Sequence, residues 1–127
     1  MNDMKDFIEK YKALLPVGTS ISYTEAEKRA GEFLYAMAII TDWRHEFTKE
    51  KIKLISFQTV TYAQELCKGT AKTMTENKVV AEASEAYIAS REDLEGSEND
   101  ILYLKTYYEI FHNAHIFFRQ LSKEGQQ

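Results

Sequence analysis

Hydrophobic side chains recur at steps of three and four residues along most of this chain, the spacing that places them on one face of an α-helix. The first such segment spans residues 3–15 and predicts a short amphipathic helix, with apolar side chains at Met4, Phe7, Ile8, Tyr11, Leu14 and Leu15. Pro16 and Gly18 are expected to end this helix. In residues 17–23, β-branched residues lie between turn-forming residues, and we expect an extended connector or a short edge strand there.

A long helix is predicted over residues 24–68. Thr24 stands at a candidate N-cap with Glu27 three residues later, the capping box that satisfies two backbone amides at a helix start. The segment contains no proline, and its apolar stripe continues through Ala36, Met37, Ile40, Trp43, Phe47, Leu54, Phe57 and Thr61. At about 1.5 Å per residue the helix would be roughly 60 Å long, and Gly69 would end it.

A second long helix is predicted over residues 78–123, after a polar loop at 69–77, with Gly96 as its weak point. Its apolar seam has coiled-coil spacing and consists of Leu94, Ile101, Tyr108 and His115, with Leu104, Phe111 and Phe118 between them. The sequence therefore predicts an all-α fold in a single domain over residues 1–127. Two long antiparallel helices would form a helical hairpin with a short N-terminal helix (1–23 with its connector). A closed three- or four-helix bundle is the alternative.

Self-association is a further expectation, because a hairpin of this length exposes more apolar surface than it can bury alone. The predicted homo-oligomer interface is the seam of the last helix, namely Leu104, Tyr108, Phe111, His115 and Phe118. The alternative is that these five side chains form an ordinary core within one chain.

Composition favours one folded domain, since 44% of the 127 residues are hydrophobic and 28% are charged. The single cysteine, Cys67, cannot form an internal disulfide. The chain has no apolar targeting segment at its start and no run close to the roughly 18 apolar residues of a membrane span, so we expect no membrane partner and a cytoplasmic location.

Charge is unevenly distributed, although the net charge is only −4. Residues 44–78 contain seven bases and four acids, a net charge of +3, whereas residues 79–109 contain eight acids and two bases, a net charge of −6. In a symmetric assembly, a mildly basic segment repeated in every subunit would bind a phosphate backbone through additive contacts. The alternative is that these charges only keep the outer faces of long helices in water.

Catalytic and metal-binding patterns are weak. Glu109-x-x-His112 and Asp42-x-x-His45 have the spacing with which helical bundles hold metals, but each copy of that motif needs further inward-facing carboxylates. The acid clusters resemble the Mg²⁺ sites of all-helical nucleotide pyrophosphatases but have few apolar neighbours, which favours a solvated face; their members are Glu82, Glu85, Glu92, Glu95 and Glu98. Without a phosphate-binding loop, nucleophile elbow or CxxC pair, we expect a protein that is not an enzyme and uses no cofactor.

The order of these features resembles the UvsY family of phage recombination mediator proteins. The amphipathic DMKDFIEKYKALL is followed by SISY, then by Glu25-Ala26 and by Leu34-Tyr35 on the first long helix. A loop with Lys72 and Lys78 comes next. AEASEAY then leads into an aromatic-rich last helix that ends in NAHIFFRQLSK. The resemblance covers nearly the whole chain and contains no catalytic signature.

The resemblance implies a recombination mediator of a bacterial host cell infected by a phage. Such proteins form rings, bind single-stranded DNA and help a RecA-like recombinase to replace single-strand binding protein. The family's DNA-contacting bases lie toward the end of the first long helix and in the loop after it, which corresponds to about Lys53 to Lys72 in this chain. The candidate DNA-binding residues are Lys49, Lys53, Lys68, Lys72 and Lys78. The alternative is a small acidic phage adaptor or inhibitor without DNA affinity, which would present its Glu82–Asp100 face to a basic host protein.

Overall fold

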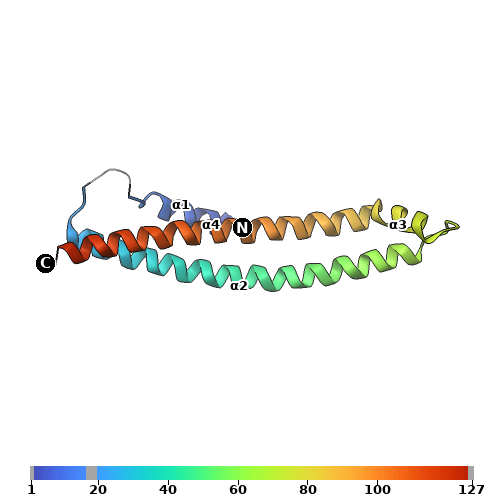
Figure 1. Ribbon diagram of the computed structural model, residues 1–127, viewed down its shortest axis with the longest axis horizontal. Helices are drawn as coiled ribbons and strands as arrows, with labels where there is room; N and C mark the ends of the chain where they lie inside the picture. Colours follow the sequence, from blue (N-terminus) through green and yellow to red (C-terminus); the bar gives the residue numbers. More distant parts are fainter. Residues whose placement is uncertain (1, 17–19, 126–127) are drawn as a thin grey trace. The chain divides into compact units, whose positions relative to one another are not determined.

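The computed structural model describes residues 2–16 and 20–125, which form helices and their connections with no β-strand among them. The four helices are α1 (Asn2–Lys12), α2 (Tyr23–Cys67), α3 (Met74–Glu82) and α4 (Glu85–Glu124), shown in Figure 1. The all-α class is confirmed, and the two long helices α2 and α4 pack against each other in antiparallel directions. The chain forms two compact units, a terminal unit (Met1–Arg44 with Tyr103–Gln127) and a middle unit (His45–Leu102).

The terminal unit contains a dense hydrophobic core. Here α1 packs onto both long helices, because the Tyr11 ring lies 6.0 Å from Phe33 on α2 and 6.1 Å from Phe111 on α4. Phe33 in turn stacks on Phe118 at 5.8 Å. The buried apolar side chains of this unit are Met4, Ile8, Tyr11, Ala26, Ala30, Phe33, Ala36, Met37, Ile40, Leu104, Phe111, Ala114 and Phe118.

The middle unit has a different interior. Its buried side chains are all small, namely Thr61, Ala81, Ser90 and Ser97. Tyr62 on α2 and Tyr87 on α4 are half-buried and meet with ring centroids 5.5 Å apart. Because no large aliphatic or aromatic side chain of this unit is fully buried, its hydrophobic stabilisation is weaker than that of the terminal unit.

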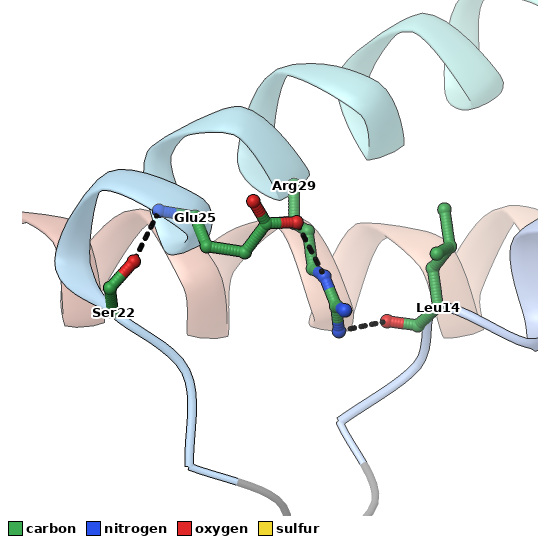
Figure 2. Close-up of polar contacts among 4 residues, drawn as sticks. All are labelled: Leu14, Ser22, Glu25 and Arg29. Atoms are coloured by element: carbon green, nitrogen blue, oxygen red, sulfur yellow. Dashed lines mark hydrogen bonds and ion pairs between the residues drawn. The ribbon is translucent and has the colours of Figure 1, made fainter.

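The start of α2 corrects two expectations. The cap is Ser22 and not Thr24, because the Ser22 Oγ accepts a hydrogen bond from the Glu25 backbone N–H at 3.1 Å (Figure 2). Ser22 and Glu25 also have capping-box spacing, and Ala26 N–H bonds to the Ser22 carbonyl at 2.9 Å, so the helix begins at Tyr23, one residue before the predicted start at 24. Residues 20–22 form no strand, and 17–19 lie outside the described residues.

The second helical segment is divided, so the prediction of one helix beginning near residue 78 was wrong. Thr73 caps α3 by accepting from the Glu76 N–H at 3.2 Å, and Ser84 caps α4 by accepting from the Tyr87 N–H at 3.2 Å. These hydroxyls compete with the backbone acceptors of a continuous helix, and the chain breaks at Ala83–Ser84. Gly96 does not interrupt α4.

None of the helices in the described residues combines the length and the apolarity that crossing a lipid bilayer requires.

Candidate functional site

The lysines predicted to bind DNA all lie in the middle unit and are all exposed. Lys49 and Lys53 are on α2, Lys68 directly follows α2, Lys72 is in the next loop and Lys78 is on α3. The loop between α2 and α3 is fixed by Asn77, whose Oδ1 accepts from the Ala71 N–H at 2.9 Å. The fold therefore holds the lysines on ordered elements of one unit.

These lysines differ in their electrostatic surroundings. Lys49 Nζ lies 3.6 Å from a carboxylate oxygen of Glu46, and Lys68 Nζ lies 3.0 Å from one of Glu65. The other three lysines, Lys53, Lys72 and Lys78, form no ion pair within the described residues. Exposed ion pairs contribute little free energy, typically about 0–1 kcal/mol, so a phosphate group can replace the exposed Glu46 carboxylate beside Lys49. The Glu65 side chain beside Lys68 is only 16% exposed.

One surface of α2 brings part of this set together. The outer stripe is a row of exposed residues spaced three or four positions apart on α2 and on the residue that follows it. Its members are Lys49, Lys53, Phe57, Val60, Gln64 and Lys68. Phe57 is 57% exposed and Val60 is 52% exposed. Lys53 and Phe57 are one helical turn apart, so an unpaired cation and an open aromatic ring lie side by side on the surface.

Phe57 was expected in the buried stripe of the first long helix, and the structure contradicts this. Leu54 and Thr61, seven residues apart, are half-buried and buried, whereas Phe57 between them is open to solvent. The 3/4 spacing permitted Phe57 on either edge of the stripe. Its exposure follows from the neighbouring helix, which the local pattern does not describe.

The predicted self-association seam divides into two groups. Leu104, Phe111 and Phe118 are buried inside the terminal unit of the single chain, as an intrachain core would require. Tyr108 and His115 are half-buried at its edge. His115 Nδ1 lies 2.8 Å from the Ala30 carbonyl oxygen, which can only accept, so Nδ1 carries the proton. An interface with a second copy at Tyr108 and His115 stays a prediction.

Exposed apolar surface is concentrated elsewhere, in the middle unit. Nine large apolar side chains of this unit are at least 37% exposed, and they are Ile52, Ile55, Phe57, Val60, Met74, Val79, Val80, Ile88 and Leu102. They contrast with the small buried residues of the same unit. They are distributed over α2, α3 and α4 of this unit.

The metal-binding and acidic patterns have no support from the geometry of the described residues. No group of three or more His, Cys, Asp or Glu side chains in that part of the chain is placed to hold a metal ion. Glu109 and His112 are exposed, and the His112 ring stacks on Tyr108 at 6.3 Å. Of the clustered acids, Glu95 pairs with Arg91 at 3.7 Å and Glu98 with Lys51 at 3.9 Å, as expected for a solvated charged face.

Comparison of the chain with protein-family models, with curated proteins and with solved structures finds no match.

Proposed function

We propose that the protein is a non-enzymatic recombination mediator that binds single-stranded DNA along the outer stripe of α2. The observation that carries the proposal is the adjacency of Lys53 and Phe57, an unpaired cation and a 57% exposed aromatic ring one turn apart. Proteins that bind single strands without reading sequence combine these two groups, because cations hold the phosphates and aromatic rings stack on bases.

The remaining lysines extend this contact. Lys49 lies one turn before Lys53 on the outer stripe, and Lys68 stands at its other end. Between Lys53 and Lys68 the stripe contains no base, so one copy has few phosphate contacts and weak affinity. Several copies in one assembly would add their contacts along the same strand, which raises the affinity without any new interaction.

Self-association has its own support in the middle unit. Seven of the exposed apolar side chains of this unit lie outside the outer stripe, and a second copy would cover them; they are Ile52, Ile55, Met74, Val79, Val80, Ile88 and Leu102. In the proposed assembly, these side chains replace the seam residues Leu104, Phe111 and Phe118, which one chain already buries.

Weak binding that does not read the base sequence would allow the protein to hand the strand to a recombinase. A strand held through its phosphates and a few stacked bases is released easily, so a RecA-like recombinase can take it over in place of single-strand binding protein. This exchange, and a site of action in the cytoplasm of a phage-infected bacterium, rest on the resemblance to UvsY-like mediators.

The test is fluorescence anisotropy of a labelled single-stranded oligonucleotide, titrated at two salt concentrations, with light scattering for the mass of the complex. We expect salt-sensitive binding by a multi-subunit species, weakened at least tenfold by Lys53→Glu with Phe57→Ala. The matched control is Lys5→Glu with Phe117→Ala, which changes the same residue types in the terminal unit. Equal affinity of the test variant and the wild type would contradict the proposal.

A second candidate is an acidic adaptor or inhibitor without DNA affinity. In its favour, the Glu82–Asp100 segment is strongly acidic, and Glu92 and Asp93 are exposed without an ion pair in the described residues. This candidate predicts no oligonucleotide binding at low salt, together with binding to a basic host protein that Glu92→Lys and Asp93→Lys would remove.

A further inference from the structure

A hollow of about 470 Å³ opens on the surface of the terminal unit between α2 and α4. Its apolar floor consists of Leu34 and Met37 from α2 and Ile116 from α4. Leu34 is 54% exposed and Ile116 is 39% exposed, so these two side chains present open aliphatic surface to a ligand, whereas Met37 is buried at 7% exposure. The volume falls within the range of small-ligand and peptide side-chain pockets, about 300–1,000 Å³.

The α4 wall of this hollow is basic. His112, His115, Arg119 and Lys123 line it and follow one another at steps of three or four residues, so they form one face of the helix. The other polar lining residue is Gln120, and no carboxylate lines the hollow. The wall therefore attracts an anion.

The cations of the wall are not neutralised by their own helix. The positions three and four residues from Arg119 hold His115, Ile116, Ser122 and Lys123, and none of these is an acid. No ion pair of Arg119 or Lys123 occurs within the described residues. An anionic ligand would therefore meet two cations without displacing a competing carboxylate.

His115 adds a fixed hydrogen-bonding group. Its Nδ1–H is held by the Ala30 carbonyl at 2.8 Å, so the ring is oriented and Nε2 is the nitrogen left for a ligand. This orientation is set before any ligand binds.

The floor indicates which anion fits. The imidazoles are the only rings that line the hollow, whereas sites for single-stranded nucleic acid use open aromatic rings on which bases stack. Aliphatic side chains, with Met37 as an adaptable member, are typical of grooves that receive apolar side chains of a peptide. The hollow combines such a floor with a cationic wall.

We propose that this hollow binds an acidic peptide segment of a partner protein. An aliphatic side chain of the segment packs against Leu34, Met37 and Ile116, and its carboxylates pair with Arg119 and Lys123. The site is in the terminal unit and shares no residue with the outer stripe of the middle unit, so it does not depend on DNA binding.

The test uses a fluorescein-labelled synthetic peptide of the repeating sequence Asp-Leu-Asp-Asp-Leu-Asp and the full-length protein. We expect saturable binding that Arg119→Glu with Lys123→Glu weakens at least tenfold. The matched control, Lys5→Glu with Lys28→Glu, makes the same change in net charge at exposed positions outside the hollow and should keep the affinity within twofold. Circular dichroism checks that both variants keep their helix content.

Two further experiments test the aliphatic contact and the preference for a peptide over a nucleic acid. Leu34→Ser, at a largely exposed position, should weaken the peptide at least threefold, and so should replacing the leucines of the peptide by serine. An unlabelled single-stranded oligonucleotide should not displace the peptide from the hollow. The proposal is overturned if the peptide does not bind, if the two charge variants weaken it equally, or if the oligonucleotide displaces it through Arg119 and Lys123.

Discussion

Arg29 on α2 donates a hydrogen bond from Nη1 to the carbonyl oxygen of Leu14, 3.3 Å away (Figure 2). Leu14 follows the end of α1, where backbone carbonyls lack helical partners. The Arg29 Nε lies 3.5 Å from Oε1 of Glu25, and the guanidinium lies over the Phe118 ring at 5.7 Å from its centroid. One side chain therefore links the end of α1, the start of α2 and α4 within the terminal unit.

Replacing Arg29 should destabilise the terminal unit. Arg29→Met keeps much of the aliphatic packing but removes the hydrogen bond to Leu14 and the cation over Phe118, and we expect a loss of about 1–2 kcal/mol in the free energy of unfolding. Urea unfolding followed by circular dichroism measures this loss. Lys28→Met, at the adjacent exposed position, is the control and should change stability by less than about 0.5 kcal/mol. An equal loss of stability in the two variants would contradict the inference that Arg29 links the three helices.

Phe111 distinguishes an intrachain core from an interface between copies. Its side chain is 0% exposed and its ring lies 5.4 Å from Phe33. We therefore expect Phe111→Ala to cost about 3–5 kcal/mol of folding stability, independently of protein concentration. Thermal unfolding at several concentrations, with light scattering for the assembly mass, tests this. A lost assembly with unchanged unfolding of the single chain would place Phe111 between copies.

Two glycines should respond in opposite directions to the same substitution. A Cβ at Gly69 would lie 2.5 Å from Oδ1 of Asn77, the atom that holds the Ala71 N–H, whereas a Cβ at Gly96 meets nothing within 4 Å. Gly69→Ala should thus destabilise the middle unit by about 1–2 kcal/mol through loss of that hydrogen bond. Gly96→Ala should stabilise α4 by about 0.5–1 kcal/mol. Hydrogen exchange of the middle unit follows both changes, and a stabilising Gly69→Ala would contradict the described loop.

Alkaline pH should weaken the terminal unit. Burial raises the pKa of the Tyr11 and Tyr103 phenols above the ordinary 10.0, with the Glu32 carboxylate adding to the effect on Tyr11. The folded state then binds these protons more tightly than the unfolded state. The resulting stabilisation is full below about pH 10 and is lost as the pH rises through the folded pKa values.

Thermal unfolding between about pH 9 and about pH 11 measures this dependence. The wild type should lose more stability over this range than Tyr11→Phe with Tyr103→Phe. Lys12, whose pKa is raised by its hydrogen bond to Glu9, contributes in the same direction in both proteins. If stability falls equally with pH in the wild type and the variant, the two phenols do not cause the pH dependence.

The helical class and most helix bounds could be predicted from local pattern. The first long helix was expected over 24–68 and extends over Tyr23–Cys67, because its apolar spacing and Gly69 are properties of the segment itself. The caps were harder to predict. Two overlapping S/T-x-x-E matches compete at Ser22 and Thr24, and the bonds formed by Glu25 and Ala26 favour the first. The apolar spacing of the second half of the chain predicts one continuous helix. The Ser84 hydroxyl instead caps a new helix there, and α3 and α4 are separate.

The candidate surfaces were predictable only in part. The exposed positions of Lys49, Lys53 and Lys68 follow from the hydrophilicity of lysine, whatever the fold. The exposure of Phe57 and the basic hollow at Arg119 and Lys123 depend on which residues of a second helix lie opposite, and this information is not local.

Long amphipathic helices follow from local sequence pattern, since apolar periodicity and the scarcity of glycine and proline act over a few helical turns. The division of the apolar residues between the interior and the surface depends on how the helices pack. Phe111 and Phe118 fill a core because α1 and α2 supply Tyr11 and Phe33 around them. The fully buried side chains of the middle unit are all small, and nine of its large apolar side chains lie at the surface.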